Sequence, residues 1–286
     1  MTFFPLPRYA TLELSGADRI HFLQGQLTQD VARLDAAGVL RAAVLNPAGR
    51  VLALARLLER EESVVLVVPE ELAASLAERL RRYVLRAKVR IALPGEALAV
   101  AGRARAPGEH PPGGARHQRL ADGASLLDLA AGALLLAPAA SLAQHLATDD
   151  GAGAAAWESA EVAAGEPGVV AATAELFTAQ MLNLDLLEAI SFTKGCYTGQ
   201  EIVARTQHLG RIKRRMFRYR SDEPVSVAPG EALHLRGAKV GEVVRAAGEP
   251  DATEILAVVS LEARDEPLAS ERGVRFAPLA LPYPIA

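Results

Sequence analysis

Cysteine is nearly absent from this chain, occurring once among 286 residues, at Cys196. One thiol cannot form a disulfide within the chain, which is typical of the reducing cytoplasm, the location we expect. It also cannot hold an iron–sulfur cluster alone, because such clusters typically need about four thiolate ligands. The six histidines are scattered, without the paired spacing of zinc ligands. We therefore expect no resident metal.

Long apolar runs and a strong net charge are missing as well. Charged residues interrupt every apolar stretch before the ~18 residues that a membrane span needs, and residues 1–9 contain two prolines and no apolar run of the kind found in signal peptides. The net charge is −3, from 31 basic and 34 acidic residues, which argues against a general surface for nucleic acid. The glycine-rich nucleotide motifs and the nucleophile elbow are also absent. We expect neither membrane association nor direct nucleic-acid binding.

The length predicts two or three domains. Apolar periodicity predicts helices over 18–34, 69–84 and 141–164, and strands over 12–14, 39–45, 50–58, 63–68, 88–93 and 126–136. This alternation indicates an α+β layer of antiparallel sheet and helices. Residues 102–123 have the composition of a loop. From residue 211 onward, short strands separated by glycine and proline indicate a small all-β domain.

The segment around the cysteine reads Lys-Gly-Cys-Tyr-Thr-Gly-Gln-Glu over residues 194–201, after a short apolar run at 190–192 that resembles a strand end. Thr198 and Glu201 fit a capping box, with Thr198 as N-cap of a helix running from 199 to about 208. Gly25, inside the first expected helix, permits either close packing or approach to a ligand.

Cys196 precedes that cap by two residues, so it is expected to face the positive end of the helix. Lys194 adds a second positive charge, and both favour the reactive thiolate. Gly195 frees the backbone between them. The alternative is that Cys196 is a small buried apolar residue. Arg205, further along the helix, is either a ligand contact or a solvated side chain.

Residues 194–201 resemble, at every position, the motif Lys-Gly-Cys-(Phe/Tyr)-x-Gly-Gln-Glu of the YgfZ family of folate-binding proteins, which includes a mitochondrial iron–sulfur assembly factor. The resemblance extends over nearly the whole chain and is weakest at 102–123. It includes residues 14–18, 22–30, Trp157 with Val162, Gly165 and Pro167, 181–185, 189–192, 240–243 and 255–258.

The family is related in fold to the glycine-cleavage T-protein. The resemblance therefore implies an α+β ring of three domains around a central channel: two ferredoxin-like domains, one interrupting the other, and a C-terminal β-barrel. The ranges it implies are 1–37 with 103–209 for the discontinuous folate-binding domain, 38–102 for the second domain and 210–286 for the barrel.

The resemblance also implies that tetrahydrofolate, or a one-carbon derivative of it, binds in the channel. The protein would then be an accessory factor that assembles or repairs iron–sulfur clusters in client enzymes, linked to tRNA modification. Cys196 would be the functional thiol and a transient iron ligand, with Lys194 as its activator. The implied folate contacts are Tyr9, Gln24, Trp157, Gln200, Glu201 and Arg205, although Tyr9 also fits a packing role and Trp157 a core anchor.

One departure bears on catalysis. Ala53 and Leu54 stand where the T-protein has its aspartate pair, so no base is available there and aminomethyl transfer is not expected. The protein is thus not expected to be a classical enzyme. Two alternatives stay open: a folate-dependent one-carbon transferase or cysteine-dependent transferase, and a folate-binding module with an incidental cysteine. The basic run 211–220 fits either a solvated edge strand or contact with a folate glutamate tail or RNA.

Overall fold

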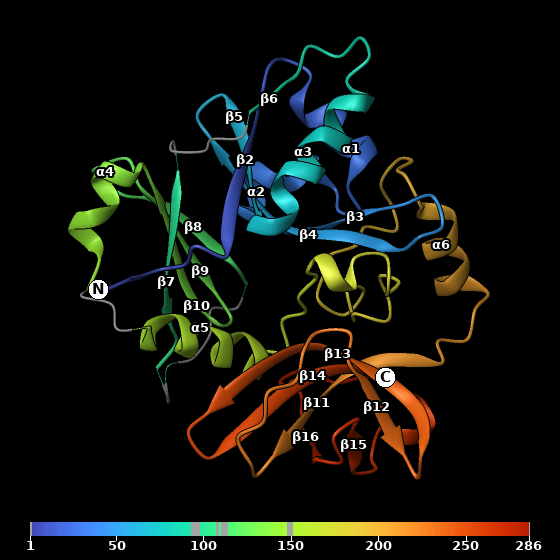
Figure 1. The fold of residues 1–286 in the computed structure, drawn as a ribbon. Coiled ribbons are helices and arrows are strands. Elements are labelled where there is room, and N and C mark those ends of the chain that lie inside the picture. The colour runs from blue at the N-terminus through green and yellow to red at the C-terminus, as the bar shows by residue number, and fades with distance from the viewer. Residues whose placement is uncertain (1, 93–97, 107–108, 110–113, 148–150, 286) are drawn as a thin grey trace.

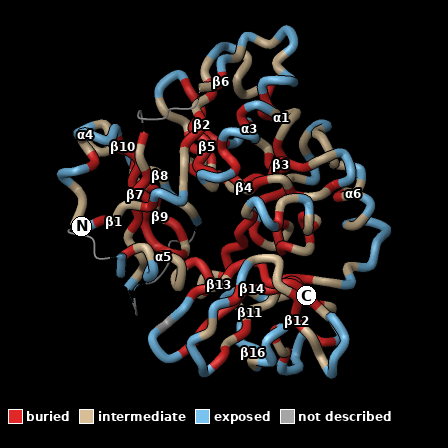
Figure 2. Tube along the Cα trace, in the orientation of Figure 1, coloured by how far each residue is buried: buried red, intermediate tan, exposed pale blue. Residues whose placement is uncertain are grey.

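The computed structural model describes residues 2–92, 98–106, 109, 114–147 and 151–285. Two antiparallel sheets with their helices lie side by side above a C-terminal barrel, and an irregular segment lies at the centre where they meet (Figure 1). Buried stretches from each part converge on this centre (Figure 2). The expected α+β architecture, with two ferredoxin-like units and a C-terminal barrel, is confirmed.

The first sheet has the strand order β3-β4-β5-β2-β6. Its strands are β2 (Tyr9–Ser15), β3 (Val39–Leu45), β4 (Val51–Arg60), β5 (Ser63–Pro69) and β6 (Arg90–Ala92). Helices α1 (Arg19–Gln26), α2 (Leu34–Ala37) and α3 (Glu70–Tyr83) belong to the same unit. Leu72, Leu76 and Leu80 recur on one face of α3 and pack in one core with the sheet, which fixes this helix against it.

The second sheet has the order β1-β7-β10-β9-β8. It consists of β1 (Phe4–Pro5), β7 (Ala99–Ala104), β8 (Arg116–Arg119), β9 (Ser125–Leu129) and β10 (Gly132–Ala137). Helices α4 (Ala139–Leu142) and α5 (Ala152–Ala163) follow it. A shared apolar core joins this sheet to one face of β3, β4 and β5.

The C-terminal barrel closes in the order β11-β14-β13-β12-β15-β16. Its strands are β11 (Arg214–Ser221), β12 (Ala232–Leu235), β13 (Ala238–Glu249), β14 (Ala252–Ser260), β15 (Leu268–Ser270) and β16 (Arg275–Leu279). Closure pairs both edges of the sheet, so no long edge strand is left exposed. Between α5 and the last helix, α6 (Gln200–His208), the chain is irregular apart from one 3₁₀ turn at Ala171–Thr173.

Several local predictions were wrong. The expected helix 18–34 ends at Gln26, because Leu27 turns into extended backbone and forms a bridge to Val44, after which a 3₁₀ turn (Val31–Arg33) and α2 follow. The expected helix 141–164 is split into α4, a 3₁₀ turn (Ala143–His145) and α5. Part of the expected loop 102–123 forms β7 and β8, and no strand forms at 190–192. Positions 107–108, 110–113 and 148–150 of these segments lie outside the described residues.

The expected domain ranges stay predictions. The two sheets, however, each combine strands from different expected ranges. Strand β2, from the range 1–37, pairs with β5 and β6, from the range 38–102. Strand β1 pairs with β7, so the N-terminal segment passes from one sheet to the other. Among the described residues, no helix is both long and apolar enough to cross a membrane.

Candidate functional site

Cys196 is exposed, on the loop that leads into α6. The alternative of a buried cysteine is therefore excluded. The Gln200 side-chain nitrogen lies 3.9 Å from the sulfur. An added Cβ at Gly195 would meet no atom within 4 Å, so the loop leaves open space beside the thiol.

The start of α6 differs from the expected capping box. Its N-cap is Gly199, with a left-handed φ of 81°, and Thr198 makes no side-chain cap. A Cβ at Gly199 would lie 2.5 Å from the Asn46 carbonyl oxygen, so the close approach of this loop to the turn at 46–49 requires glycine. The amide oxygen of Gln200 instead accepts a hydrogen bond from the Tyr197 N–H at 3.0 Å.

Lys194 fastens the cysteine loop to the end of α1. Its ammonium donates to the carbonyl oxygens of Gln24, Leu27 and Gln29 at 2.7, 2.7 and 2.9 Å, and lies 5.1 Å from the centre of the Tyr197 ring. A cation is favourable here because the last carbonyls of a helix carry partial negative charge. Burial lowers the pKa of this ammonium to about 8, against the opposing attraction of a nearby carboxylate. The geometry assigns Lys194 a fastening role; thiol activation stays a prediction.

Gln24 also serves the local structure. Its side-chain nitrogen donates to Asp30 at 2.7 Å, and its side-chain oxygen accepts from the Val31 N–H at 2.8 Å. The Gly25 carbonyl accepts from the Thr198 N–H at 3.4 Å. A Cβ at Gly25 would meet no atom within 4 Å, so this glycine borders open space rather than a tight packing contact.

A small cavity of about 50 Å³ lies where the first sheet, the irregular segment and the barrel meet, with Tyr9, Leu54 and Val67 in its wall. Three arginines, Arg41, Arg56 and Arg245, also line it. Larger spaces share wall residues with it, one of about 480 Å³ through Tyr9. Another of about 150 Å³ shares Tyr9 and Arg245, and one of about 510 Å³ shares Arg41 and reaches 191–193 of the cysteine loop.

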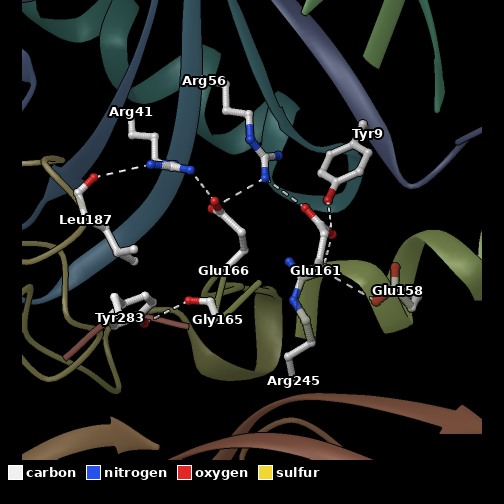
Figure 3. Close-up of polar contacts among 10 residues, drawn as sticks. All are labelled: Tyr9, Arg41, Arg56, Glu158, Glu161, Gly165, Glu166, Leu187, Arg245 and Tyr283. Atoms are coloured by element: carbon white, nitrogen blue, oxygen red, sulfur yellow. Dashed lines mark hydrogen bonds and ion pairs between the residues drawn. The ribbon is translucent and has the colours of Figure 1, made fainter. Parts of the chain in front are cut away.

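The arginines are held by two glutamates (Figure 3). Arg56 lies 2.8 Å from a Glu161 oxygen and 3.6 Å from a Glu166 oxygen. Arg41 pairs with Glu166 and Arg245 with Glu161. Because Arg245 belongs to the barrel and Arg56 to the first sheet, Glu161 of α5 joins all three parts of the molecule.

Tyr9 also contacts the Glu161 carboxylate. Its hydroxyl donates to Glu161 at 2.6 Å. Burial alone raises the pKa of Glu161, but Arg245 and Arg56 outweigh burial and lower it to about 2. Burial lowers the pKa of both guanidiniums, but the same carboxylate outweighs burial and holds their pKa above the ordinary value. At neutral pH all three groups are charged, and Glu161 is too weak a base to take up a proton.

The other expected folate contacts lie apart from this cavity. Trp157 is wholly buried in the core between the two sheets and does not line the cavity, which corrects the expected channel position in favour of a core anchor. Glu201 and Arg205 are exposed on α6. The structure thus gathers Cys196, Lys194, Gln24 and Gln200 in one place, and Tyr9 in another.

The basic run 211–220 is largely neutralised within the protein. Arg215 and Asp185 form a two-pronged pair at 2.9 and 2.8 Å. Arg214 pairs with Glu242, and Arg218 with Glu254. These contacts favour a structural role for the run over contact with a folate tail or RNA.

Five charged residues of this cluster were not predicted from the sequence: Arg41, Arg56, Glu161, Glu166 and Arg245. A signal was present, because Arg41 and Arg56 interrupt strands that are otherwise almost wholly apolar up to that point, and Glu161 interrupts an alanine-rich helix. Charged side chains are rarely buried unless they are paired. Their partners, however, are up to 125 residues away in the sequence.

Comparison with known proteins places these features in a family. No family model matches the chain. It is 32% identical over 231 residues to a tRNA-modifying protein YgfZ of Serratia proteamaculans (76% of this chain, 70% of the relative), and 33% identical over 250 residues to one of Yersinia pseudotuberculosis (82% and 75%). The glycine-cleavage aminomethyltransferase T of Bartonella henselae has a similar fold, with a TM-score of 0.71, 16% identity, and coverage of 98% of this chain and 85% of that one. The identities and coverage show that this chain belongs to the YgfZ family.

Proposed function

We propose that this protein binds a reduced folate and supports iron–sulfur clusters in client enzymes, including one that modifies tRNA. The observation that carries the proposal is the exposed Cys196 on a loop that Lys194 fastens to α1. An exposed thiol on a fixed loop is available to a partner protein, whereas a buried thiol is not. The link to tRNA modification rests on the names of the relatives.

The residues around the largest of these spaces suit the chemical groups of a folate. The space of about 510 Å³ between Arg41 and the cysteine loop has the size of small-molecule sites. It offers the Phe192 ring, the cations Arg33 and Arg41, and the carboxylate of Glu188. A ring system and an amino-pyrimidine edge find matching groups there, and Arg41, which also lines the small cavity, can meet an anionic tail. The Arg41 Nε is buried without a partner among the described residues, which leaves a donor for a ligand.

These residues of the larger space, with Tyr9 across the small cavity, are the ones we expect to hold the folate. The cavity of about 50 Å³ is too small for a bicyclic ring, so within it Tyr9 can meet only a narrow part of the ligand, although Tyr9 also borders the space of about 150 Å³. When bound, a reduced folate supplies a one-carbon unit or reducing equivalents. Cys196 then serves as a transient iron ligand or as a redox group toward the client.

The alternative of a folate-dependent one-carbon transferase finds less support. Leu54 lines the cavity and Ala53 is buried, so neither of these positions on β4 offers a carboxylate. Glu161 is held in ion pairs and has a pKa of about 2. Purified protein with an aminomethylated carrier and tetrahydrofolate should therefore produce no methylene-tetrahydrofolate, and steady turnover would favour the transferase.

The deciding experiment is rescue of a bacterial strain that lacks its own family member. Iron–sulfur enzyme activities and tRNA modification are measured after complementation with the wild type, Cys196→Ser and Thr198→Ser. We expect wild type and Thr198→Ser to restore both, and Cys196→Ser to restore neither at equal protein level. Full rescue by Cys196→Ser would refute the role of the thiol. Calorimetry with tetrahydrofolate tests the ligand separately, and the absence of heat and of any thermal shift would refute folate binding.

A further inference from the structure

The small cavity holds more positive than negative charge. Arg41, Arg56 and Arg245 line it, while Glu161 and Glu166 are the carboxylates paired with them, so three positive charges meet two negative ones. At its rim, Arg8 and Glu158 form a pair of their own, and Glu158 also approaches Arg245 at 3.4 Å. Glu70 and Glu71 border the neighbouring space but are exposed to solvent, which screens them. One positive charge in this group is left without a carboxylate counterpart, and Arg41, whose side chain is 26% exposed, is the least buried of the three arginines.

Each arginine also has an unused donor. The Nε atoms of Arg41, Arg56 and Arg245 are buried, and none has a hydrogen-bond partner among the described residues. The Arg245 side chain is only 9% exposed. A buried charged donor without an acceptor is costly, because it has lost its water and gained nothing in return. An anionic acceptor would satisfy the three donors and balance the excess positive charge.

The position of Arg245 is shaped by the backbone. A Cβ at Gly168 would lie 2.9, 3.0 and 3.2 Å from three atoms of the Arg245 guanidinium. The absence of a side chain at this position therefore lets the guanidinium lie directly against the chain. Gly168 and Arg245 both line the cavity, so this close contact is part of the cavity wall.

We propose that this cavity binds a carboxylate group. A free space of about 50 Å³ has room for a few water-sized groups, which suits a carboxylate and not a ring system. A planar carboxylate matches the fork of a guanidinium, and a single negative charge balances the excess. The carboxylate has two potential sources: a free small acid, or the end of a longer ligand reaching in from an adjoining space. For the second source the glutamate tail of a folate is the candidate, and this alone rests on the proposed function.

The first test uses small ligands on the full-length protein. Thermal unfolding and calorimetry are recorded with sodium acetate and with L-glutamate, and with acetamide and sodium chloride as neutral and ionic controls. We expect acetate to raise the melting temperature in a saturable manner, as a ligand of the native state does, and acetamide to have no such effect. Equal stabilisation by chloride at the same ionic strength would overturn the site.

Two variants shift the charge in opposite directions. Arg41→Gln removes the excess charge, yet leaves Arg56 beside Glu166 and both Arg56 and Arg245 beside Glu161. It should weaken the affinity for acetate roughly tenfold or more, which is the loss expected when one charge-assisted hydrogen bond is removed. Glu166→Gln frees Arg41 from its competing carboxylate and should tighten binding. Arg82→Gln, on the exposed face of α3, is the control and should leave binding unchanged.

Opposite shifts in affinity distinguish a binding site from a structural cluster, which would show only losses of stability. If either variant fails to fold, Gly168→Ala displaces Arg245 without a change in charge and should weaken acetate binding. Unchanged acetate affinity in a folded Arg41→Gln or Gly168→Ala protein would refute the site.

Competition identifies the source. If acetate displaces tetrahydrofolate and Arg41→Gln weakens both, the glutamate tail occupies the cavity. If the two bind independently, the cavity takes a free acid. If acetate binds and tetrahydrofolate does not, the carboxylate site stands and the folate proposal fails; if tetrahydrofolate binds and acetate and L-glutamate do not, the carboxylate site fails.

Discussion

Arg41 and Arg56 lie directly opposite each other on the neighbouring strands β3 and β4. Like charges in such a pair repel and destabilise a sheet. Here Glu166 and Glu161 approach from the irregular segment and from α5, so each of these two guanidiniums is paired with a carboxylate (Figure 3). The repulsion within the pair is thus compensated only when the irregular segment and α5 are packed beside this sheet.

The ion pairs of Glu161 should make stability depend on acidic pH. Its pKa is about 2 in the folded protein, against an ordinary value of 4.5. A carboxyl group with a lowered folded pKa stabilises fully above its unfolded pKa, and this contribution is lost as the pH falls through 4.5 toward 2. In urea unfolding at a series of pH values, the wild type should lose more stability over this window than Glu161→Gln.

The exposed control for this comparison is Glu262→Gln, which should follow the wild type. Parallel pH profiles for wild type and Glu161→Gln would contradict the assignment of a charged, paired Glu161.

The thiol of Cys196 should react in the native state. It is exposed, and Gly195 beside it leaves open space. Iodoacetamide should therefore modify it without denaturant, at a rate that does not change with small, non-denaturing amounts of urea. Modification that proceeds only in step with global unfolding would show that the loop shields the thiol.

Replacing Lys194 should loosen the cysteine loop. Lys194→Met removes three hydrogen bonds to the end of α1, and we expect a loss of about 1–2 kcal/mol in stability. Hydrogen exchange should speed up at 24–29 and 194–199 in particular. Lys194→Arg should restore part of the protection, because it keeps the positive charge.

The matched control is Lys213→Met, at an exposed lysine directly before β11. Equal exchange rates in Lys194→Met and Lys213→Met would argue that the ammonium does not fasten the loop.

Two glycines of one loop should respond differently to alanine. Gly199→Ala places a Cβ 2.5 Å from the Asn46 oxygen at a left-handed φ of 81°, so we expect a loss of roughly 1–2 kcal/mol or more and fraying of the first turn of α6. Gly195→Ala meets no atom within 4 Å and should be nearly neutral. Urea unfolding measures both, and equal effects would contradict the close approach at Gly199.

The family and the α+β class with its C-terminal barrel could be predicted from the sequence, which also pointed to the segment around Cys196 as a candidate site. These follow from local signals: a motif of eight adjacent residues, apolar periodicities, and turn residues. Local signals failed at element ends, because pairing with a distant strand, as between Leu27 and Val44, outweighed helical propensity.

The contacts of the charged and aromatic residues, by contrast, depend on the folded arrangement. This arrangement turned Lys194 toward the end of α1, placed Trp157 in the core, and paired Arg56 with a glutamate 105 residues away. Electrostatic and packing partners depend on distance in space, and the sequence carries no measure of that distance until the chain is folded. The three-arginine cavity therefore exists only where the first sheet, the irregular segment and the barrel meet.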